Sequence, residues 1–113
     1  QDLPHMIRTY LNEHYMQELQ QTDVAAVFHM SGPYFSQYFK QSFGVNYVQY
    51  LNSLRIEKAK LLLVTTQNST ESIGALVGIP NVNYFFRLFK KTEGCTVREY
   101  RKRHTESKKV HKS

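Results

Sequence analysis

The segment 34–50 of this sequence is partly repeated 50 positions later, in the segment 84–100. Six residue pairs in one short stretch are identical in this register: Tyr34 and Tyr84, Phe35 and Phe85, Phe39 and Phe89, Lys40 and Lys90, Gly44 and Gly94, Tyr50 and Tyr100. Just upstream, Ser31 and Asn81 share the offset, and both residue types are good helix N-caps. The repeat predicts a duplicated helical unit. Two copies are too few for a solenoid, which usually needs three or more.

Each copy has the outline of a helix-turn-helix, in which a short helix, a turn and a capped second helix follow one another. In the first copy, the compact apolar segment 22–28 precedes a turn and a helix over residues 31–43. In the second copy, a helix over residues 69–77 precedes a turn and a helix over residues 82–93. A glycine follows each second helix, as expected of a C-cap.

The segments around these copies also have helical patterns. A helix beginning near Asp2 places Ile7, Leu11 and Tyr15 on one apolar stripe. A second, capped by Asn46, runs to about Thr66 with Val48, Leu51, Arg55, Ala59, Leu62 and Leu63 on its inward side. A last short helix is capped by Thr96 and runs through Tyr100.

No segment has a convincing strand pattern. The predicted fold is therefore all-α, with about seven helices and two helix-turn-helix subdomains joined by a long linker helix. The expected parts are a first subdomain over 1–45, the linker over 46–66, a second subdomain over 67–103 and a basic, disordered tail over 104–113. Gly74 inside a short helix costs about 1 kcal/mol relative to Ala, which predicts a looser second subdomain.

Composition narrows the function classes. The net charge is +6, and the segment 98–113 holds seven Lys and Arg against two acids. This basicity weakly favours nucleic acid as a partner. A single cysteine, Cys95, excludes an intramolecular disulfide and fits the reducing cytoplasm. No apolar run is long enough to cross a membrane. Because the sequence begins at Gln1, we expect it to be a fragment of a longer protein.

Catalytic chemistry lacks the residues it needs. The five histidines are scattered without metal-ligand spacing, and no Cys/His or Ser/His/Asp constellation or glycine-rich phosphate loop is present. The sequence therefore predicts no enzyme, no cofactor and no metal site. A helix-turn-helix instead places its second helix in the DNA major groove, with its N-terminal residues against base edges.

The stretch NYVQYLNSLRIEKAKLLLVTT, followed by VGIPNVNYFFRLFKKTEGCTVREYRK, resembles the DNA-binding domain of the AraC/XylS family of bacterial transcription regulators. The resemblance covers about residues 5–103. It implies two helix-turn-helix units bridged by a linker helix. The implied function is sequence-specific binding of double-stranded promoter DNA in two adjacent major-groove segments, most often as an activator that contacts RNA polymerase. It also implies a sensor or receiver domain elsewhere in the full-length protein, and a cytoplasmic location.

The resemblance assigns base reading to the exposed N-terminal faces of the two second helices. The implied base-reading residues are Gly32, Pro33, Ser36, Gln37, Val82, Asn83, Phe86 and Arg87. Arg87 can donate to guanine O6 and N7, and Gln37 and Asn83 can pair with adenine. Because Gly32 and Pro33 offer little hydrogen bonding, we expect a degenerate operator with less information under the first unit.

Phosphate contacts are expected from residues near these faces. The implied set is Ser31, Lys40, Asn81, Lys90 and Lys91. Such contacts position a protein on DNA without specifying sequence. Backbone N–H groups after Ser31 and Asn81 lie at helix N-termini, where phosphate binds readily.

The family pattern is not followed everywhere. Phe86 stands where a small polar residue is usual, so its ring either meets a thymine methyl group or turns inward. Gln20 replaces the usual Ser or Thr cap, which predicts a helix that begins later, at Thr22.

Alternatives to DNA reading stay open at this stage. Arg87 could form a structural ion pair, and Gln37, Asn83 and the lysines could be ordinary solvated residues. The rival function is a helical protein–protein interaction module without DNA binding, anchored by Tyr34, Tyr38 and Phe86.

Overall fold

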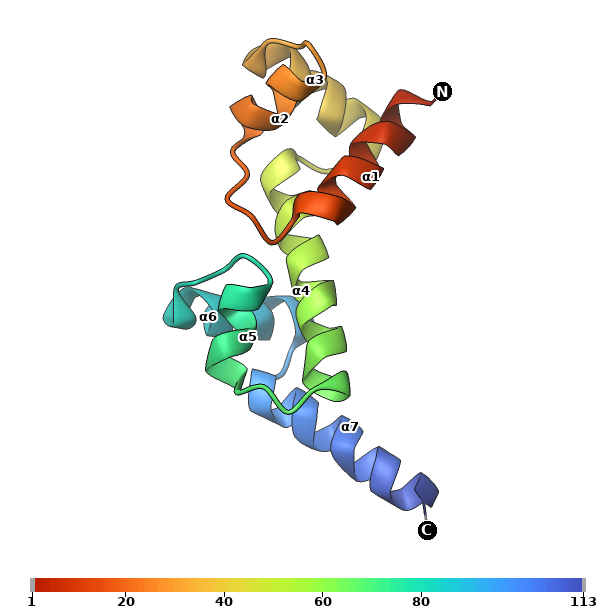
Figure 1. Ribbon diagram of the computed structural model, residues 1–113, viewed down its shortest axis with the longest axis vertical. Helices are drawn as coiled ribbons and strands as arrows, with labels where there is room; N and C mark the ends of the chain where they lie inside the picture. The colour runs from red at the N-terminus through yellow and green to blue at the C-terminus, as the bar shows by residue number, and fades with distance from the viewer. Residues whose placement is uncertain (1, 113) are drawn as a thin grey trace. The chain divides into compact units, whose positions relative to one another are not determined.

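A computed structural model describes the backbone of residues 2–112 and the side chains of residues 2–105. Over this range the chain forms seven α-helices and no strand, which confirms the predicted all-α class (Figure 1). The helices are α1 (Leu3–His14), α2 (Gln21–Val27), α3 (Gly32–Phe43), α4 (Tyr47–Thr65), α5 (Thr70–Leu76), α6 (Val82–Glu93) and α7 (Val97–Lys112). None of them, within the described part of the chain, is both long and apolar enough to cross a membrane.

The chain divides into two compact units, which we call unit 1 (Gln1–Leu54) and unit 2 (Arg55–Ser113). The division falls inside α4, which is one continuous helix of 19 residues. The linker helix that the sequence predicted over 46–66 overlaps α4, and buried side chains occur along both parts of this helix.

The core of unit 1 is rich in aromatic rings. Ile7 and Leu11 of α1 are fully buried against a cluster that includes Val24 of α2 and Phe39 of α3. The Phe39 ring stacks on Phe43 with centroids 4.1 Å apart. Two further rings meet it edge-on, those of Tyr47 at 5.7 Å and Tyr50 at 5.4 Å. The apolar stripe predicted on α1 therefore covers one side of this core.

The core of unit 2 is more aliphatic. The largest fully buried side chains of this unit are Ile56, Leu63, Ile73, Val77, Phe85 and Phe89. Phe89 meets Phe85 at 6.1 Å and Tyr100 at 5.6 Å between ring centroids. Cys95 is buried as well, so the single thiol is a packed core group in this fold.

The second helix of each helix-turn-helix begins and ends in the same way. The Oγ of Ser31 accepts a hydrogen bond from the Tyr34 N–H at 3.2 Å, and the Oδ1 of Asn81 accepts one from the Tyr84 N–H at 2.9 Å. Both helices end at a glycine with φ of 79°, a left-handed conformation that favours this residue. The predicted N-caps and C-caps are thus confirmed.

Helix α7 is fixed at its start and along one side. Thr96 and Glu99 form a capping box, with the Thr96 N–H donating to Glu99 at 2.9 Å and the Glu99 N–H donating to the Thr96 hydroxyl at 3.1 Å. The hydrogen bond from the Thr96 backbone N–H is the main cause that lowers the pKa of Glu99, and the hydrogen bond with the Thr96 side chain adds to it. Arg101 donates from Nε to the Leu63 carbonyl at 2.9 Å and from Nη2 to the Thr66 carbonyl at 3.3 Å. Arg101 therefore satisfies two backbone carbonyl groups at the end of α4.

A lysine ties α4 to α6 inside unit 2. The Nζ of Lys60 lies 3.0 Å from a carboxylate oxygen of Glu57 and 3.1 Å from one of Glu93. The hydrogen bond to Glu57 is the main cause that raises the pKa of Lys60, and Glu93 adds to it. The same ammonium group lies 5.9 Å from the centroid of the Tyr100 ring.

Three sequence-based expectations differ from the structure. Helix α7 continues to Lys112, past the end expected near Tyr100. Helix α2 begins at Gln21, before the expected Thr22, since the Gln20 N–H itself donates to Asp23 at 3.3 Å in a cap. Val48 is 61% exposed, whereas neighbouring Tyr47 faces the core that was assigned to Val48.

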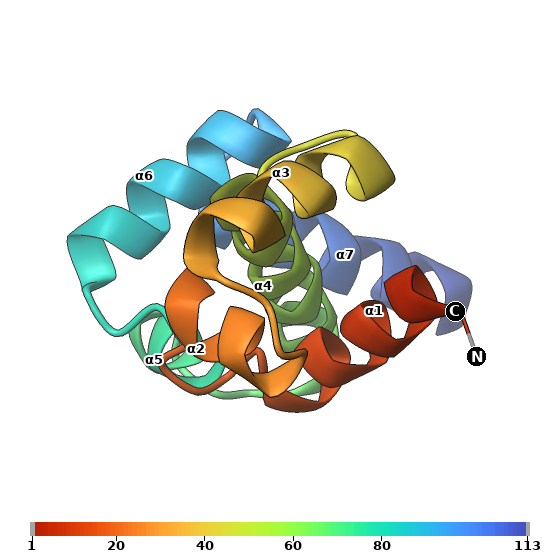
Figure 2. The same cartoon turned by 90° about the horizontal axis from the view of Figure 1, so that it is seen from above.

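Gly74 has a packing reason that the sequence did not reveal. A Cβ atom at this position would lie 2.8 Å from the Ile79 carbonyl oxygen and 2.9 Å from ring atoms of Phe85. Both distances are shorter than side chains normally allow, so only glycine lets α5 approach α6 this closely. The expected cost of a helical glycine is therefore accompanied by a close contact between the two helices of the second helix-turn-helix. Figure 2 shows the turn that joins α5 to α6.

Candidate nucleic-acid interface

The N-terminal half of α3 has one buried and one exposed face. Phe35 and Phe39 are fully buried, and this fixes the rotation of the helix. Pro33, Ser36 and Gln37 consequently lie on the exposed face. The fold thus brings the three predicted base-reading side chains of unit 1 to one solvent-facing surface, which we call the α3 face (Pro33, Ser36, Gln37). Gly32 is half-buried beside it and adds no side chain.

The equivalent surface of α6 is less uniform. The rotation of α6 is fixed by Phe85 and Phe89, which are fully buried as their counterparts in α3 are. Asn83 and Arg87 are exposed, whereas Val82 and Phe86 are half-buried. We call this set the α6 face (Val82, Asn83, Phe86, Arg87). Its hydrogen-bonding side chains are the two exposed ones.

Phe86 takes an intermediate position between the two predicted alternatives. Its ring lies 6.0 Å from the Phe85 ring, tilted by 44°, and the residue is half-buried. One part of the ring therefore packs against the core of unit 2. The remaining part stays accessible at the α6 face and can offer only apolar contact.

Arg87 is exposed and lies beside an aromatic ring of its own helix. Its guanidinium carbon lies 6.0 Å from the centroid of the Tyr84 ring on the same helix. Within the described residues it forms no ion pair with a carboxylate. The structural ion pair considered from the sequence is thus absent from this part of the chain, and the exposed guanidinium keeps its donors for a partner.

The predicted phosphate-binding residues flank the two faces. Lys40 on α3 and Lys90 and Lys91 on α6 are all exposed. Ser31 and Asn81 use their side-chain oxygens to cap their own helices. In α3 this leaves only the Gly32 N–H of the first turn, because Pro33 has no N–H and that of Tyr34 is bonded to Ser31. In α6 the N–H groups of Val82 and Asn83 remain at the helix N-terminus, where anions can bind.

Two exposed tyrosines at equivalent positions were not among the DNA contacts predicted from the sequence. Tyr34 is 58% exposed and Tyr84 is 40% exposed, each on the solvent side of its helix next to a buried phenylalanine. Tyr34 was considered only as an anchor for a protein partner. The signal that could have identified the pair was the repeated Tyr-Phe dipeptide, in which one ring must be buried and the other exposed.

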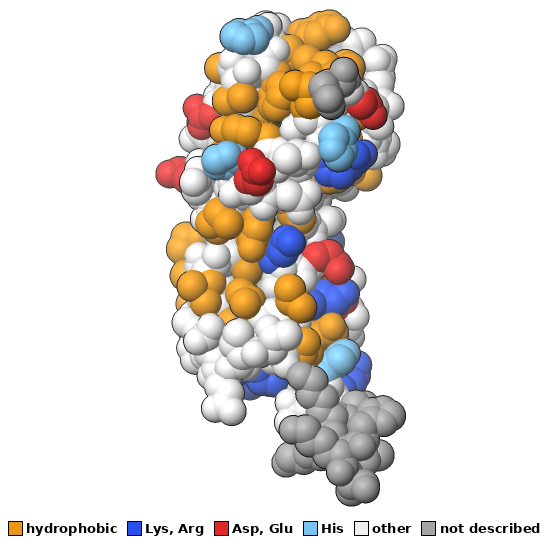
Figure 3. Space-filling model, turned by 45° about the vertical axis from the view of Figure 1, so that its right-hand side comes forward, with side chains coloured by type: hydrophobic (Ala, Val, Ile, Leu, Met, Phe, Trp, Pro, Cys, Tyr) orange, Lys and Arg blue, Asp and Glu red, His pale blue; other side chains and the backbone are white. Residues whose placement is uncertain are grey.

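Charge is distributed unequally between the units. Unit 1 carries two Lys and Arg against four Asp and Glu, whereas unit 2 carries thirteen against five. On the face drawn in Figure 3, acidic and histidine side chains gather over the unit that contains α1, and most Lys and Arg side chains over the other. The electrostatic attraction to a polyanion thus comes almost entirely from unit 2.

Comparison with known proteins places the fold and the family. Residues 24–103 match the model of a family described as a helix-turn-helix domain. An uncharacterized HTH-type transcriptional regulator of Bacillus subtilis, YisR, is 38% identical over 93 residues, which are 82% of this chain and 32% of that protein. The chain spans about a third of the length of the first curated relatives it matches.

Two solved structures are similar in fold. The C-terminal domain of the two-component response regulator yesN from Fusobacterium nucleatum has a TM-score of 0.83 and 35% identity, covering 87% of this chain and 96% of that one. The DNA-binding domain of AdpA, solved in complex with a target DNA, has a TM-score of 0.89 at 21% identity, covering 95% and 96%. The second likeness is one of fold alone.

Proposed function

This chain belongs to the AraC-type family of helix-turn-helix domains, and we propose that it reads two adjacent major-groove segments of double-stranded DNA, one with α3 and one with α6. The family is one of DNA-binding domains without catalytic activity. The proposed role is sequence-specific promoter recognition within a bacterial transcription regulator.

One observation carries this proposal. Both second helices bury a phenylalanine pair and thereby present polar side chains from their N-terminal turns to solvent. Gln37, Asn83 and Arg87 are the residue types that form specific hydrogen bonds with adenine or guanine in the major groove. Lysines one turn further along each helix are suited to the phosphates beside the groove.

The two segments should lie about one turn of B-DNA, or ~34 Å, apart, because paired helix-turn-helix units read successive major-groove segments on one side of the duplex. Because the α3 and α6 faces differ, the site in DNA should be asymmetric.

The two segments should contribute unequally to specificity. The α3 face offers Ser36 and Gln37, and its Pro33 has no hydrogen-bonding side chain. The α6 face adds a guanidinium, and a bidentate contact of Arg87 with guanine discriminates by about 1–3 kcal/mol. We therefore expect the better defined half of the operator to lie under α6.

The rest of the regulator follows from the family and belongs to the same proposal. The full-length protein acts in the cytoplasm, most simply as an activator that contacts RNA polymerase. A sensor or receiver domain in the longer chain supplies the signal. The yesN protein, whose C-terminal domain this chain resembles, is itself described as a two-component response regulator.

Selection from a random duplex library, followed by affinity measurements of the winning sequence against salt, tests the proposal. The expected result is an asymmetric motif of two blocks about one helical turn apart, with a steep salt dependence. Failure to enrich any sequence, together with a flat salt dependence, would favour the protein-interaction module instead.

Two variants separate base reading from phosphate contact. Arg87→Ala should relax the preference at one base pair by about 1–3 kcal/mol and leave the other positions unchanged. Lys90→Ala, one turn away on the same helix, should weaken all sequences alike. A uniform loss in Arg87→Ala would contradict the base-reading role of that residue.

A further inference from the structure

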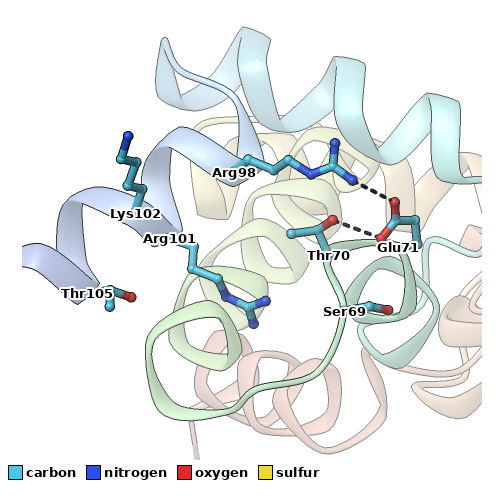
Figure 4. A pocket seen from close by; sticks show the side chains of 7 residues that line it. All are labelled: Ser69, Thr70, Glu71, Arg98, Arg101, Lys102 and Thr105. Atoms are coloured by element: carbon cyan, nitrogen blue, oxygen red, sulfur yellow. Dashed lines mark hydrogen bonds and ion pairs between the residues drawn. The ribbon is translucent and has the colours of Figure 1, made fainter.

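A cleft in unit 2 is lined by residues outside the α6 face. It is an open depression of about 570 Å³ between the start of α5 and one side of α7 (Figure 4). Small-molecule sites usually occupy about 300–1,000 Å³, so the space is sufficient for a compact ligand. Three of its lining residues are cationic, namely Arg98, Arg101 and Lys102, against the single carboxylate of Glu71. The cleft thus concentrates positive charge.

One guanidinium in the cleft is held in place by neutral groups. Arg101 donates to the carbonyl oxygens of Leu63 and Thr66 at 2.9 and 3.3 Å. Carbonyl groups orient the guanidinium without cancelling its positive charge, and Nη1 keeps its donors. Figure 4 shows the Arg98 and Arg101 side chains extending from α7 toward the segment that opens α5. Arg101 is therefore held in one orientation, with Nη1 available to an anion.

The second guanidinium is paired with an exchangeable partner. The Nη2 of Arg98 lies 2.9 Å from an oxygen of Glu71, and their side chains are 71% and 50% exposed. Such an exposed pair contributes little to stability. Hydrogen bonds from its own backbone N–H and from Thr70, together with Arg98, lower the pKa of Glu71. Glu71 therefore stays ionised at neutral pH, where it competes with an incoming anion.

Hydroxyl groups complete the lining. The hydroxyls of Ser69, Thr70 and Thr105 border the same space. The Ser69 oxygen accepts the Ser72 N–H at 3.1 Å, so its own hydrogen can donate to a ligand. Lys102 forms no ion pair among the described residues, and its flexible stem allows the ammonium to reach a bound anion.

We propose that this cleft of unit 2 is a phosphate-binding site, formed by residues other than those of the α3 and α6 faces. Planar guanidinium groups match the oxygens of a phosphate in paired hydrogen bonds, and a dianion can displace the single carboxylate of Glu71 from Arg98. The phosphate comes either from a small phosphate ester or from the DNA backbone beside the recognised groove. Only the second source rests on the proposed function.

Inorganic phosphate is the first probe. The chain is titrated with phosphate at pH 7.5 and constant ionic strength, and amide resonances are followed by NMR, with chloride as the control anion. The expected result is a saturable set of shifts confined to residues 69–71 and 98–102. Phosphate that shifts these resonances no more than chloride does would overturn binding of free phosphate.

Matched substitutions locate the site. Arg98→Gln removes a lining cation, whereas Arg103→Gln removes an equally charged, exposed residue of the same helix outside the cleft. Arg98→Gln should weaken phosphate binding roughly tenfold or more, and Arg103→Gln should leave it nearly unchanged. Glu71→Gln removes the competitor and should strengthen binding severalfold. All three positions are exposed, so thermal unfolding should stay close to that of the parent chain.

DNA titrations distinguish the two sources. If the phosphate belongs to the DNA backbone, Arg98→Gln should lower the slope of log affinity against log salt by about 0.9, and Arg103→Gln should not. If the source is a small ester, DNA affinity should be equal in the two variants while the phosphate titration differs. Equal behaviour of Arg98→Gln and Arg103→Gln in both titrations would refute the site.

Discussion

The two units use one helix-turn-helix plan with different means of holding it together. In unit 1, Ala25 of α2 lies where unit 2 has Gly74 of α5, as matching turn bonds show: the Met30 N–H donates to Ala25 at 2.9 Å, and the Ile79 N–H donates to Gly74 at 2.7 Å. Unit 1 fills its core with clustered aromatic rings, whereas unit 2 has a glycine at the contact between its two helices. The same backbone plan therefore tolerates two solutions to packing.

Charge separates the units as clearly as packing does. Unit 2 holds thirteen of the fifteen Lys and Arg residues, and unit 1 has more acids than bases. Under the proposed function, unit 2 supplies most of the electrostatic attraction, and the α3 face reads DNA from a unit that the phosphates do not attract. The comparison predicts that equivalent substitutions in the two units have unequal consequences.

The largest expected effect concerns the ring that each unit buries at the same repeat position. Phe39→Ala and Phe89→Ala should each cost about 3–5 kcal/mol of unfolding free energy. Phe39 should cost about 1 kcal/mol more, because it meets more rings, and aromatic pairs add about 0.5–1.5 kcal/mol beyond burial. Urea unfolding measures the loss, and amide exchange assigns it to a unit. Equal costs would contradict the distinction between an aromatic and an aliphatic core.

The next comparison concerns Gly74 of α5 and the equivalent Ala25 of α2, each of which is replaced by the residue type found in the other unit. Gly74→Ala should destabilise unit 2 by about 1–3 kcal/mol, because the added Cβ meets Ile79 and Phe85 below normal contact distance. Ala25→Gly should cost about 1 kcal/mol from helix propensity alone. Amide exchange of each unit measures both. If Gly74→Ala stabilised unit 2, the sequence-based view of a merely weakened helix would be correct after all.

Substitutions in the turns of the two helix-turn-helix motifs should change stability in opposite directions. His29 has a φ of 59° and Gly78 has a φ of 99°, and both lie in the left-handed region. A side chain there costs about 1–2 kcal/mol. His29→Gly should therefore stabilise unit 1 by up to about 1 kcal/mol, and Gly78→Ala should destabilise unit 2 by about as much. Thermal unfolding monitored by circular dichroism would reveal the signs. A loss of stability in His29→Gly would show that its side chain contributes more than its backbone costs.

Caps, turns and periodicity made most of the fold predictable. Ser31, Asn81, Gly44 and Gly94 each identify a helix end by local chemistry, and the structure has them in those roles. Val48 was assigned wrongly because a long helix with apolar residues on several sides has no single stripe. The requirement for Gly74 depends on a neighbour in another helix, so no local pattern could reveal it.

The candidate site was predictable in part for the same reasons. Once Phe35 and Phe85 are placed in the core, the exposure of Gln37 and Arg87 follows from helical periodicity. The half-buried state of Phe86 does not follow, because it depends on the position of the Phe85 ring. Nor could the sequence bring Glu71 and Arg98 together, since they are 27 positions apart. The base-reading and phosphate roles themselves remain predictions.

The smallest expected effect tests whether the electrostatic contrast extends to DNA binding. Lys40 and Lys90 occupy the same repeat position, and both are exposed. If each meets one phosphate, Lys40→Gln and Lys90→Gln should lower the slope of log affinity against log salt by about 0.9 each. Because Lys40 is one of only two Lys and Arg residues in unit 1, its loss removes half of that unit's cations. Lys40→Gln should then also shorten the footprint under α3, whereas Lys90→Gln leaves the footprint unchanged because other unit 2 cations hold the DNA. An unchanged footprint in both variants would mean that base contacts alone keep unit 1 on the duplex.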